Sequence, residues 1–402
     1  MAQDPWPVDW RRNLAVLWFA QFTAIFGFSF AFPFLPIYLQ QDLGVTDRHV
    51  LAVWSGAAGA ASGAALAVLS PVWGILADRF GRKSMLIRAM IGGGLMVGAI
   101  AFAQTPLELV GLRFMQGAFS GTVAATTTLV ATGTPRDRVG WSMGILSSAV
   151  ALGGAVGPFA GGVAAGVFGL RLIFLAGGVL LLISVLPVVF LVREMPFRRA
   201  GASPAALLPA LRAAGPASLL TVIVLLLAQS LLQVSWAGSQ PLVTLKLLTL
   251  VSANTTTLTG LAFAASGAAS AAAAFVYSSL ARRSGYRVLC TTAALLATLA
   301  LVLMALAGNA VLVIVATLLS GLFFGALGPA ISTMLGLEAP AEVQGRIFGF
   351  SASATAVGFA LGPLIGGLVA GLVNVPVALL AVAAFALLLG VEMAFFSREP
   401  VR

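Results

Sequence analysis

The sequence is poor in charge. Asp, Glu, Lys and Arg together make up only 8% of the 402 residues, whereas hydrophobic residues make up 60%. A soluble domain is about one quarter charged, so this composition excludes an ordinary soluble fold. Uncharged runs such as residues 51–73 exceed the roughly 18 residues that cross a membrane as one helix. We therefore predict a protein that crosses the bilayer many times.

Cysteine and histidine are nearly missing. Cys290 is the single cysteine and His49 the single histidine, which excludes a disulfide framework, a CxxC metal site and a Ser–His–Asp catalytic set. We expect no metal, no cofactor and no enzymatic activity. The net charge of +10 does not indicate a nucleic-acid partner, because the basic residues are expected in loops between apolar helices.

Acidic residues are also scarce. Of the 12 in the chain, all but one are expected in loops or close to helix ends. The exception is Glu392, which falls in the last apolar run near its inner end. Few carboxylates are thus placed to carry a proton, and Asp42 and Glu108 are the best candidates besides Asp78.

The apolar runs predict twelve membrane helices and an all-α fold. The expected spans are 14–39, 51–76, 85–104, 108–131, 141–166, 170–192, 218–242, 254–280, 287–307, 310–335, 345–372 and 374–397. The only long polar connection, residues 193–217, is expected to be a cytoplasmic linker. It divides the chain into an N-terminal six-helix bundle (1–192) and a C-terminal six-helix bundle (218–402).

Basic residues are distributed unequally between the two sides of the predicted membrane. Arg48, Arg171 and Lys246 are expected in outer segments and Arg113 inside a helix, while the other 18 of the 22 Lys and Arg residues lie on the side of the N-terminus. Because positive charge accumulates on the cytoplasmic side, we predict that both termini are cytoplasmic.

The two halves repeat each other. Residues 134–166 align without a gap with residues 339–371, and "LADRFGRK" (76–83) corresponds to "LARRSGYR" (280–287). Six helices separate the copies, so both begin on the same side of the membrane. The repeat is therefore parallel, about an axis along the membrane normal.

Several motifs resemble the major facilitator superfamily across essentially the whole chain. "GILADRFGRK" (74–83) is similar to the loop between its second and third helices, and "LRFMQG" (112–117) to its helix-four motif. "GGAVGPFAGG" (153–162) is similar to the helix-five motif of drug/proton antiporters. The chain is identified as a member of the twelve-helix bacterial multidrug efflux branch. The resemblance implies two parallel-repeat six-helix bundles.

The charged loop 74–83 has two interpretations. Its basic residues can hold it at anionic lipid, and Gly81 suits a tight turn. The resemblance implies a further role, in which Asp78 binds the positive N-terminal end of the eleventh helix near residues 344–346 and latches the halves together. The predicted members of this gate are Gly74, Asp78, Arg79, Gly81, Arg82, Lys83 and Asp137.

Arg113 lies about six residues into the predicted fourth helix, where a charge is costly and normally faces a cavity. The second copy has Thr317 there, so folding of the repeat does not require the charge. Arg113 could reach outward to water or pair with Glu108 for structural reasons only. The resemblance implies a role of Arg113 in proton coupling.

Two further sets of residues are predicted from spacing. Small residues of the fifth and eleventh helices should allow close helix packing and help to seal the cavity: Gly153, Gly157, Pro158, Gly161, Gly162, Gly362, Pro363 and Gly366. Neutral polar and aromatic residues should line a substrate cavity suited to bulky amphiphiles, although helix packing also explains the glutamines: Gln21, Phe28, Gln116, Ser120, Gln229, Gln233 and Trp236.

The preferred hypothesis is proton-driven efflux of lipophilic or amphipathic small molecules by alternating access. We expect a monomer in the inner membrane of a bacterium, surrounded by lipid and powered by the proton gradient. One alternative is a proton-coupled uptake symporter for a small metabolite. A non-transporting membrane receptor is the less favoured alternative.

Overall fold

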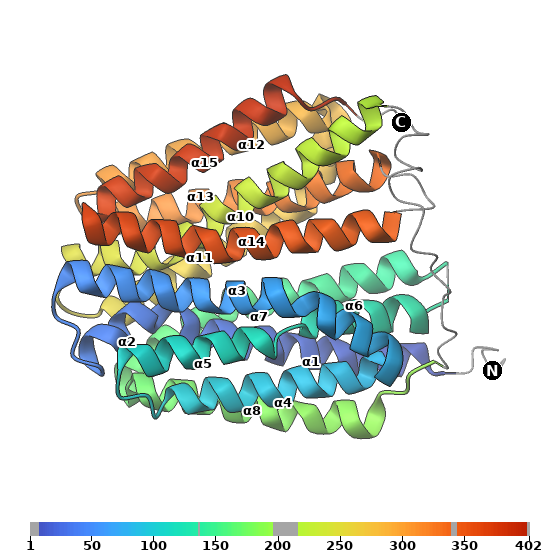
Figure 1. Ribbon diagram of the computed structural model, residues 1–402, viewed down its shortest axis with the longest axis horizontal. Coiled ribbons are helices and arrows are strands. Elements are labelled where there is room, and N and C mark those ends of the chain that lie inside the picture. Colours follow the sequence, from blue (N-terminus) through green and yellow to red (C-terminus); the bar gives the residue numbers. More distant parts are fainter. Residues whose placement is uncertain (1–7, 136, 196–215, 339–343, 400–402) are drawn as a thin grey trace.

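The structure is a computed structural model, and it describes residues 8–135, 137–195, 216–338 and 344–399. This part of the chain is helical throughout, as predicted. With the labels of Figure 1, the N-terminal half contains α1 (Trp10–Ala31), η1 (Phe32–Phe34), α2 (Leu35–Gln41), α3 (Arg48–Phe80), α4 (Arg82–Ile100), α5 (Pro106–Ala118), α6 (Thr122–Gly133), α7 (Val139–Phe168) and α8 (Leu170–Leu191). The C-terminal half contains α10 (Pro216–Leu250), α11 (Thr255–Ser284), α12 (Tyr286–Leu306), α13 (Ala310–Glu338), α14 (Gln344–Leu372) and α15 (Val375–Phe395).

Short polar side chains start several of these helices. Asp9, Asp47, Thr105 and Asn374 each accept a hydrogen bond from a backbone N–H in the first turn of α1, α3, α5 and α15, respectively. These N–H groups have no acceptor inside the helix, so the caps fix where each apolar run begins its helix.

The predicted membrane segments correspond closely to these helices, with two corrections. Eleven stretches in the described part are long and apolar enough to cross a membrane. The fourth predicted span, 108–131, is divided into α5 and α6, which are each too short. The seventh runs to Leu250 instead of residue 242, so Lys246 lies inside α10, 6% exposed, and not in an outer loop.

The burial of Lys246 has a local cause. Its Nζ donates to the carbonyl of Ala305, 3.0 Å away, in the last turn of α12. In the N-terminal half, the Tyr38 hydroxyl donates to the Ile100 carbonyl, 2.8 Å away, at the end of α4. Carbonyls in the last turn of a helix lack an internal partner. Each half therefore uses a side chain from its first membrane segment to satisfy the end of its third membrane segment.

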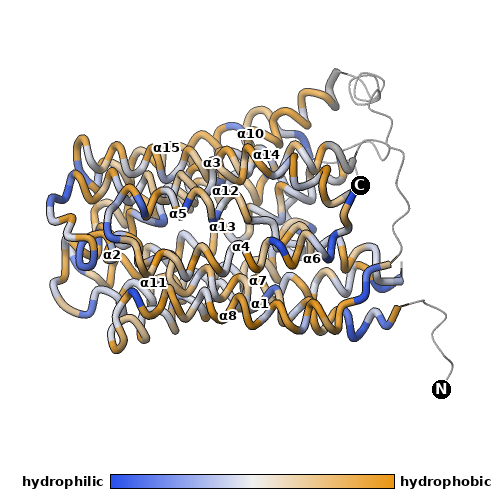
Figure 2. Tube along the Cα trace, turned by 60° about the horizontal axis from the view of Figure 1, so that its bottom comes forward, coloured by the Kyte–Doolittle hydropathy of each residue, from blue (hydrophilic) through white to orange (hydrophobic). Residues whose placement is uncertain are grey.

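The helices run roughly alongside one another, and both ends of the chain lie at the same end of the bundle (Figure 1). We call the end at which α1 starts and α15 stops the terminal end, and the opposite end, with the loops at residues 42–47, 101–105, 251–254 and 307–309, the distal end. Hydrophilic residues gather mainly at these two ends, whereas the shafts of the helices are mostly hydrophobic (Figure 2). This distribution is typical of a protein whose shafts lie in lipid.

The parallel repeat is visible at the terminal end. Gly81, with φ of 87°, joins α3 to α4, and Gly285, with φ of 86°, joins α11 to α12. Beside Gly81, the Glu194 carboxylate accepts hydrogen bonds from the backbone N–H groups of Arg82 and Lys83 at 2.7 and 3.1 Å. Beside Gly285, Glu399 does the same for Tyr286 and Arg287 at 2.8 and 2.9 Å. A carboxylate at a helix N-terminus satisfies free donors and opposes the helix dipole.

The two halves touch mainly through the helix pairs α3–α14 and α7–α11. A Cβ placed on Gly56 would lie 2.6 Å from the Gly367 Cα, and one placed on Gly63 would lie 2.6 Å from the Ala360 nitrogen. The same register would bring Gly74 opposite Gly349 three turns further on. Both of those glycines instead face open space. The pair α3–α14 is thus closed distally and separated toward the terminal end.

The pair α7–α11 shows the same asymmetry. A Cβ on Gly162 would lie 2.9 Å from the Gly260 Cα, and one on Gly267 would lie 2.8 Å from the Ala155 Cα. Gly144 and Gly140, further toward the terminal end, face open space. The halves are therefore packed together at the distal end and apart at the terminal end.

Candidate functional site

Arg113 is a buried charge beside the interface between the halves. Its side chain is 5% exposed. Nε donates to the Ala58 carbonyl at 3.2 Å, Nη2 donates to the Ser62 hydroxyl at 2.8 Å, and Nη1 donates to the Gln116 side chain. The guanidinium lies 4.4 Å over the Phe32 ring. Arg113 therefore neither reaches outward to water nor pairs with Glu108.

The acceptors of Arg113 connect it to the contact between the halves. Ala58 and Ser62 face α5, whereas Gly59 and Gly63, each one residue further along α3, face α14. A Cβ on Gly59 would lie 2.7 Å from the Pro363 side chain. Arg113 thus contacts the same part of α3 that packs against the C-terminal half.

The break between α5 and α6 lies one turn beyond Gln116. Gly121 has φ of 127°, which other residues rarely adopt. The break frees backbone carbonyls, and neighbouring side chains bind them. Trp73 Nε1 donates to the Ala118 carbonyl at 2.7 Å, and Arg88 Nη2 donates to the Ser120 carbonyl at 3.1 Å. Broken helices are tolerated in membranes only where freed groups are satisfied in this way.

Arg88 also stacks on Trp73, with its guanidinium 3.5 Å from the ring centre. The C-terminal half has Tyr277 and Thr292 at the corresponding positions, and its fourth helix, α13, is continuous. The break therefore belongs to the N-terminal half alone, next to Arg113. The single helix predicted over 108–131 would carry Arg113, Gln116 and Ser120 without interruption, and the break between α5 and α6 corrects that expectation.

The predicted cavity residues form three groups, which lie on α1, at the break between α5 and α6, and on α10. Gln21 is buried and its side-chain oxygen accepts a hydrogen bond from Thr126 at 2.7 Å, which ties α1 to α6. Phe28 packs between Gly93 of α4 and Leu181 of α8, inside the N-terminal half. Gln116 binds Arg113, and the Ser120 carbonyl binds Arg88.

The third group lies on α10. Trp236 packs edge-on against Phe359 of α14, with ring centres 5.6 Å apart, and Gln233 lies against Gly358. The buried side-chain oxygen of Gln229 has no hydrogen-bond partner among the residues that the structure describes. Beyond Trp236 toward the distal end, Gln240 borders a space of only about 10 Å³ that residues of both halves line. This volume fits about one water molecule, so the distal side is tightly closed.

The glycines of α7 and α14 divide between two neighbours. Gly153, Gly157 and Gly161 press against α1, and Gly358, Gly362 and Gly366 press against α10, all within their own half. The contacts with the other half come from adjacent positions. Gly162 and Pro158 meet α11, and Gly367 and Pro363 meet α3. These helices therefore pack closely in two directions, but the ladders themselves do not face the opposite half.

The predicted latch residues lie at the separated end. Gly74 faces open space, Asp137 forms an exposed ion pair with Arg138 at 3.3 Å, and Lys83 Nζ donates to the Val189 carbonyl at 2.8 Å. Arg79 lies 5.4 Å from the Phe80 ring. The side chains of Asp78 and of residues 344–346 lie outside the described part of the chain. Glu194, which caps α4 beside Gly81, was missed, although "RE" recurs at 193–194 and 398–399.

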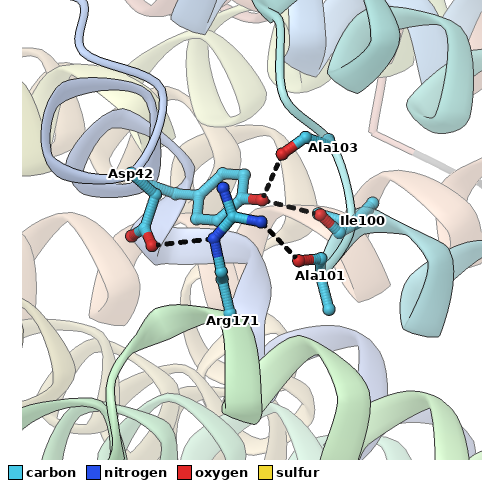
Figure 3. Close-up of polar contacts among 6 residues, drawn as sticks. Asp42, Ile100, Ala101, Ala103 and Arg171 are labelled. Carbon is cyan, nitrogen blue, oxygen red and sulfur yellow. Dashed lines mark hydrogen bonds and ion pairs between the residues drawn. The ribbon is translucent and has the colours of Figure 1, made fainter.

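The candidate proton carriers have different surroundings. Asp42 pairs with Arg171 Nε at 3.2 Å, and Arg171 Nη1 also donates to the Ala101 carbonyl at 3.0 Å (Figure 3). Glu108 accepts from the backbone N–H of Gln104 at 2.9 Å. Both lie at the distal end and hold helix ends in place. Glu392 is 8% exposed inside α15, and within the described part of the chain neither of its carboxyl oxygens has a hydrogen-bond partner.

Sequence comparison agrees with this architecture. The family model of the Major Facilitator Superfamily matches residues 17–253 and 225–402. Multidrug resistance protein MdtG of Citrobacter koseri is 32% identical over 361 residues, which cover 89% of this chain and 88% of that protein. MdtG of Klebsiella pneumoniae is 32% identical over 364 residues, covering 89% and 87%.

Solved structures share the fold. A mutant of the nucleoside transporter NupG superposes with a TM-score of 0.78 at 16% identity, covering 97% of this chain and all of that one. A bacterial homologue of the lysosomal transporter Spinster, in an inward-facing and occupied conformation, gives a TM-score of 0.78 at 14% identity and covers 98% and 97%.

Proposed function

Because the chain belongs to the Major Facilitator Superfamily, whose members are membrane transporters and not enzymes, we propose that it is a proton-driven efflux transporter for lipophilic or amphipathic small molecules. Its MdtG relatives are named as multidrug resistance proteins, which supports export of such compounds. In this proposal the protein is a monomer in the inner membrane of a bacterium. Both termini are cytoplasmic, in accord with the unequal distribution of basic residues.

The observation that carries the proposal is the one-sided contact between the halves. α3–α14 and α7–α11 are packed at the distal end, and their glycines face open space at the terminal end. Alternating access requires two arrangements in which the closed side is exchanged. With the termini in the cytoplasm, this conformation is open toward the cytoplasm, where an exporter would collect its substrate.

In this proposal, Arg113 couples proton binding to the conformational change together with nearby carboxylates. A buried positive charge favours ionisation of a nearby acid, and Arg113 contacts the segment of α3 that seals the halves. Asp42, Glu108 and Asp78 are the proposed partners during the cycle. The latch between Asp78 and the start of α14, with Arg82 and Asp137, would form when the terminal end closes.

The proposal is tested with purified protein in liposomes that contain a pH-sensitive dye. When the liposome lumen is more acidic than the outside, the protein should drive accumulation of a lipophilic dye substrate in the lumen. Addition of that substrate should release protons from the lumen, in the opposite direction. Protons that move in the same direction as the substrate would indicate the uptake symporter instead. Binding without any flux, in vesicles that hold a gradient, would indicate the non-transporting receptor.

Orientation is tested separately with reporter fusions. Alkaline phosphatase and a green fluorescent protein fused after Asp42 and after Arg199 should give opposite results, because the positive-inside rule places these positions on opposite sides. The same result at both positions would contradict the proposed topology without affecting the transport measurement.

A further inference from the structure

The single histidine of the chain bridges the two halves at the closed distal end. His49 lies in the first turn of α3, and Gly371 lies in the last turn of α14. The Nδ1 atom of His49 is 2.7 Å from the Gly371 carbonyl oxygen. The carbonyls of a last helical turn lack an internal partner and carry the negative end of the helix dipole. The imidazole therefore meets an acceptor that favours a positively charged donor.

We propose that His49 is a proton-binding site at which protonation holds the distal end closed. A neutral imidazole can carry its hydrogen on either nitrogen, and only the Nδ1–H form can donate to Gly371. The imidazolium always carries an Nδ1–H, and its charge also interacts favourably with the end of α14. Imidazole is the side chain that normally changes charge between pH 5 and 8, so the contact is tested across that range.

The carboxylate of Asp47 places a negative charge beside His49 in the chain. The Asp47 carboxylate accepts hydrogen bonds from the backbone N–H groups of Val50 and His49 at 2.9 Å, and these bonds lower the pKa of Asp47. Asp47 is thus a fixed negative charge two residues from the imidazole, whereas Arg48 is an exposed positive one. The other charges near the distal ends of the helices around α3 already have partners within the N-terminal or the C-terminal half: Asp42 with Arg171, Glu108 with the Gln104 N–H and Lys246 with the Ala305 carbonyl. In the last turn of α14, Gly371 and Leu372 carry no titratable group.

The second interface between the halves provides an internal comparison. Gly166 of α7 corresponds to Gly371 in the repeat, and it faces the hydroxyls of Thr257 and Thr256 on α11, 3.7 and 3.8 Å from a Cβ placed there. Threonine does not titrate in this range. The α7–α11 interface therefore has threonines near the glycine that corresponds to Gly371, whereas the α3–α14 interface has the imidazole of His49 bonded to Gly371.

The consequence for the cycle follows from linkage. Opening the distal end separates α3 from α14 and breaks the His49–Gly371 bond, so the closed state binds the proton more tightly than the open state does. Acid must then shift the population toward the closed state. If the distal end faces outward, as in the proposed function, external protons would drive the transporter toward its cytoplasm-open conformation.

The experiment measures the distal distance directly and needs no substrate or transport. Cysteines for spin labels replace Gln104 and Gly308, which lie in exposed distal loops of the two halves, in a Cys290→Ala background. Double electron–electron resonance is recorded at pH 5.5 and pH 8.0. A charged group at a helix terminus typically contributes enough to change the closed-to-open ratio roughly two- to fivefold, and we expect that increase at pH 5.5.

Two His49 variants and one control decide the outcome. His49→Gln should remove the pH dependence, and His49→Arg, with a permanent charge, should hold the closed population high at both pH values. Thr257→Val, at the non-titrating interface, should keep the pH dependence of the parent. A His49→Gln protein that retains the full pH response would overturn the proposal. So would a parent that shows no response, even if proton-driven efflux were established independently.

Discussion

Among single residues, Arg113 is important for the shape of its guanidinium as well as for its charge. Three of its nitrogens bind three different acceptors, on α3 and on α5 itself, while the side chain remains 5% exposed. Arginine has a planar fork of five donors, whereas lysine has one ammonium at the end of a flexible chain. Shape and charge are therefore both required at this position.

We expect Arg113→Lys to lower proton-driven efflux at least about tenfold, because the ammonium cannot hold Ala58, Ser62 and Gln116 at once and hydrogen bonds from charged donors contribute about 1.5–3 kcal/mol each. Equilibrium binding of the substrate should persist. Both quantities are measured on the same purified protein in liposomes. The matched control is Arg138→Lys in an exposed ion pair, which should be silent. Normal proton flux in Arg113→Lys would exclude the coupling role.

At the element scale, the fourth membrane segment consists of two short helices where the hydropathy pattern predicts one. Gly121 permits the turn between them, and Trp73 and Arg88 satisfy the carbonyls that the break exposes. Phe119 fits beside Gly92 of α4, where a Cβ would overlap the ring. Sequence-distant residues thus stabilise a break that the local sequence barely signals.

Gly121→Ala should lower the melting temperature in detergent, because a non-glycine residue at φ of 127° costs about 1–3 kcal/mol. Gly111→Ala is the control, since Gly111 lies within α5 and faces open space. There the added methyl group should be neutral or stabilising by up to about 1 kcal/mol. Equal melting temperatures for the two variants would argue that α5 and α6 join into one helix in the membrane.

The paired helix caps at the terminal end provide a second prediction at this scale. Glu194→Gln and Glu399→Gln should each destabilise the protein by about 1–2 kcal/mol, because the amide retains one acceptor where the carboxylate has two and loses the favourable charge at the helix N-terminus. Glu338→Gln, at the last residue of α13, is the control and should not destabilise. Chemical denaturation in mixed micelles gives the comparison. If only one of the two substitutions lowered the stability, the two caps would not contribute equally to the free energy of unfolding.

At the scale of the whole molecule, four helices decide which end is open. α3 contacts α14, and α7 contacts α11, in a fixed register at the distal end. These contacts are lost toward the terminal end. Rocking of one half against the other would exchange these contacts without unfolding any helix. The positions that face each other at one end therefore report the state of the transporter.

Cysteine pairs on α7 and α11 test this arrangement in a Cys290→Ala background. Gly166→Cys with Thr257→Cys should form a disulfide, because a Cβ at 166 lies 3.7 Å from the Thr257 hydroxyl oxygen, which occupies a position that a cysteine sulfur at 257 can take. Gly144→Cys with Ser278→Cys follows the same register at the terminal end and should remain reduced. Conditions that open the distal end should reverse both results. Immediate cross-linking of the 144–278 pair, without such conditions, would contradict the open terminal end.

The all-helical membrane fold, the parallel repeat and the turn at Gly81 can be predicted without coordinates, because hydropathy over one helix length and backbone freedom at a glycine are local properties. The sequence by itself also singles out Arg113, since a charge inside an apolar run is visible without coordinates. The acceptors of Arg113, the break at Gly121 and the inward packing of Phe28 depend on residues far away in the chain.

Only the tertiary structure decided those features, together with the burial of Lys246 against Ala305 and the caps formed by Glu194 and Glu399. It also decided at which end the halves separate. A polar group in an apolar interior is stable only beside a suitable partner, and the helix packing selects that partner. The hydropathy of a single segment carries no information about which neighbour will satisfy its polar groups.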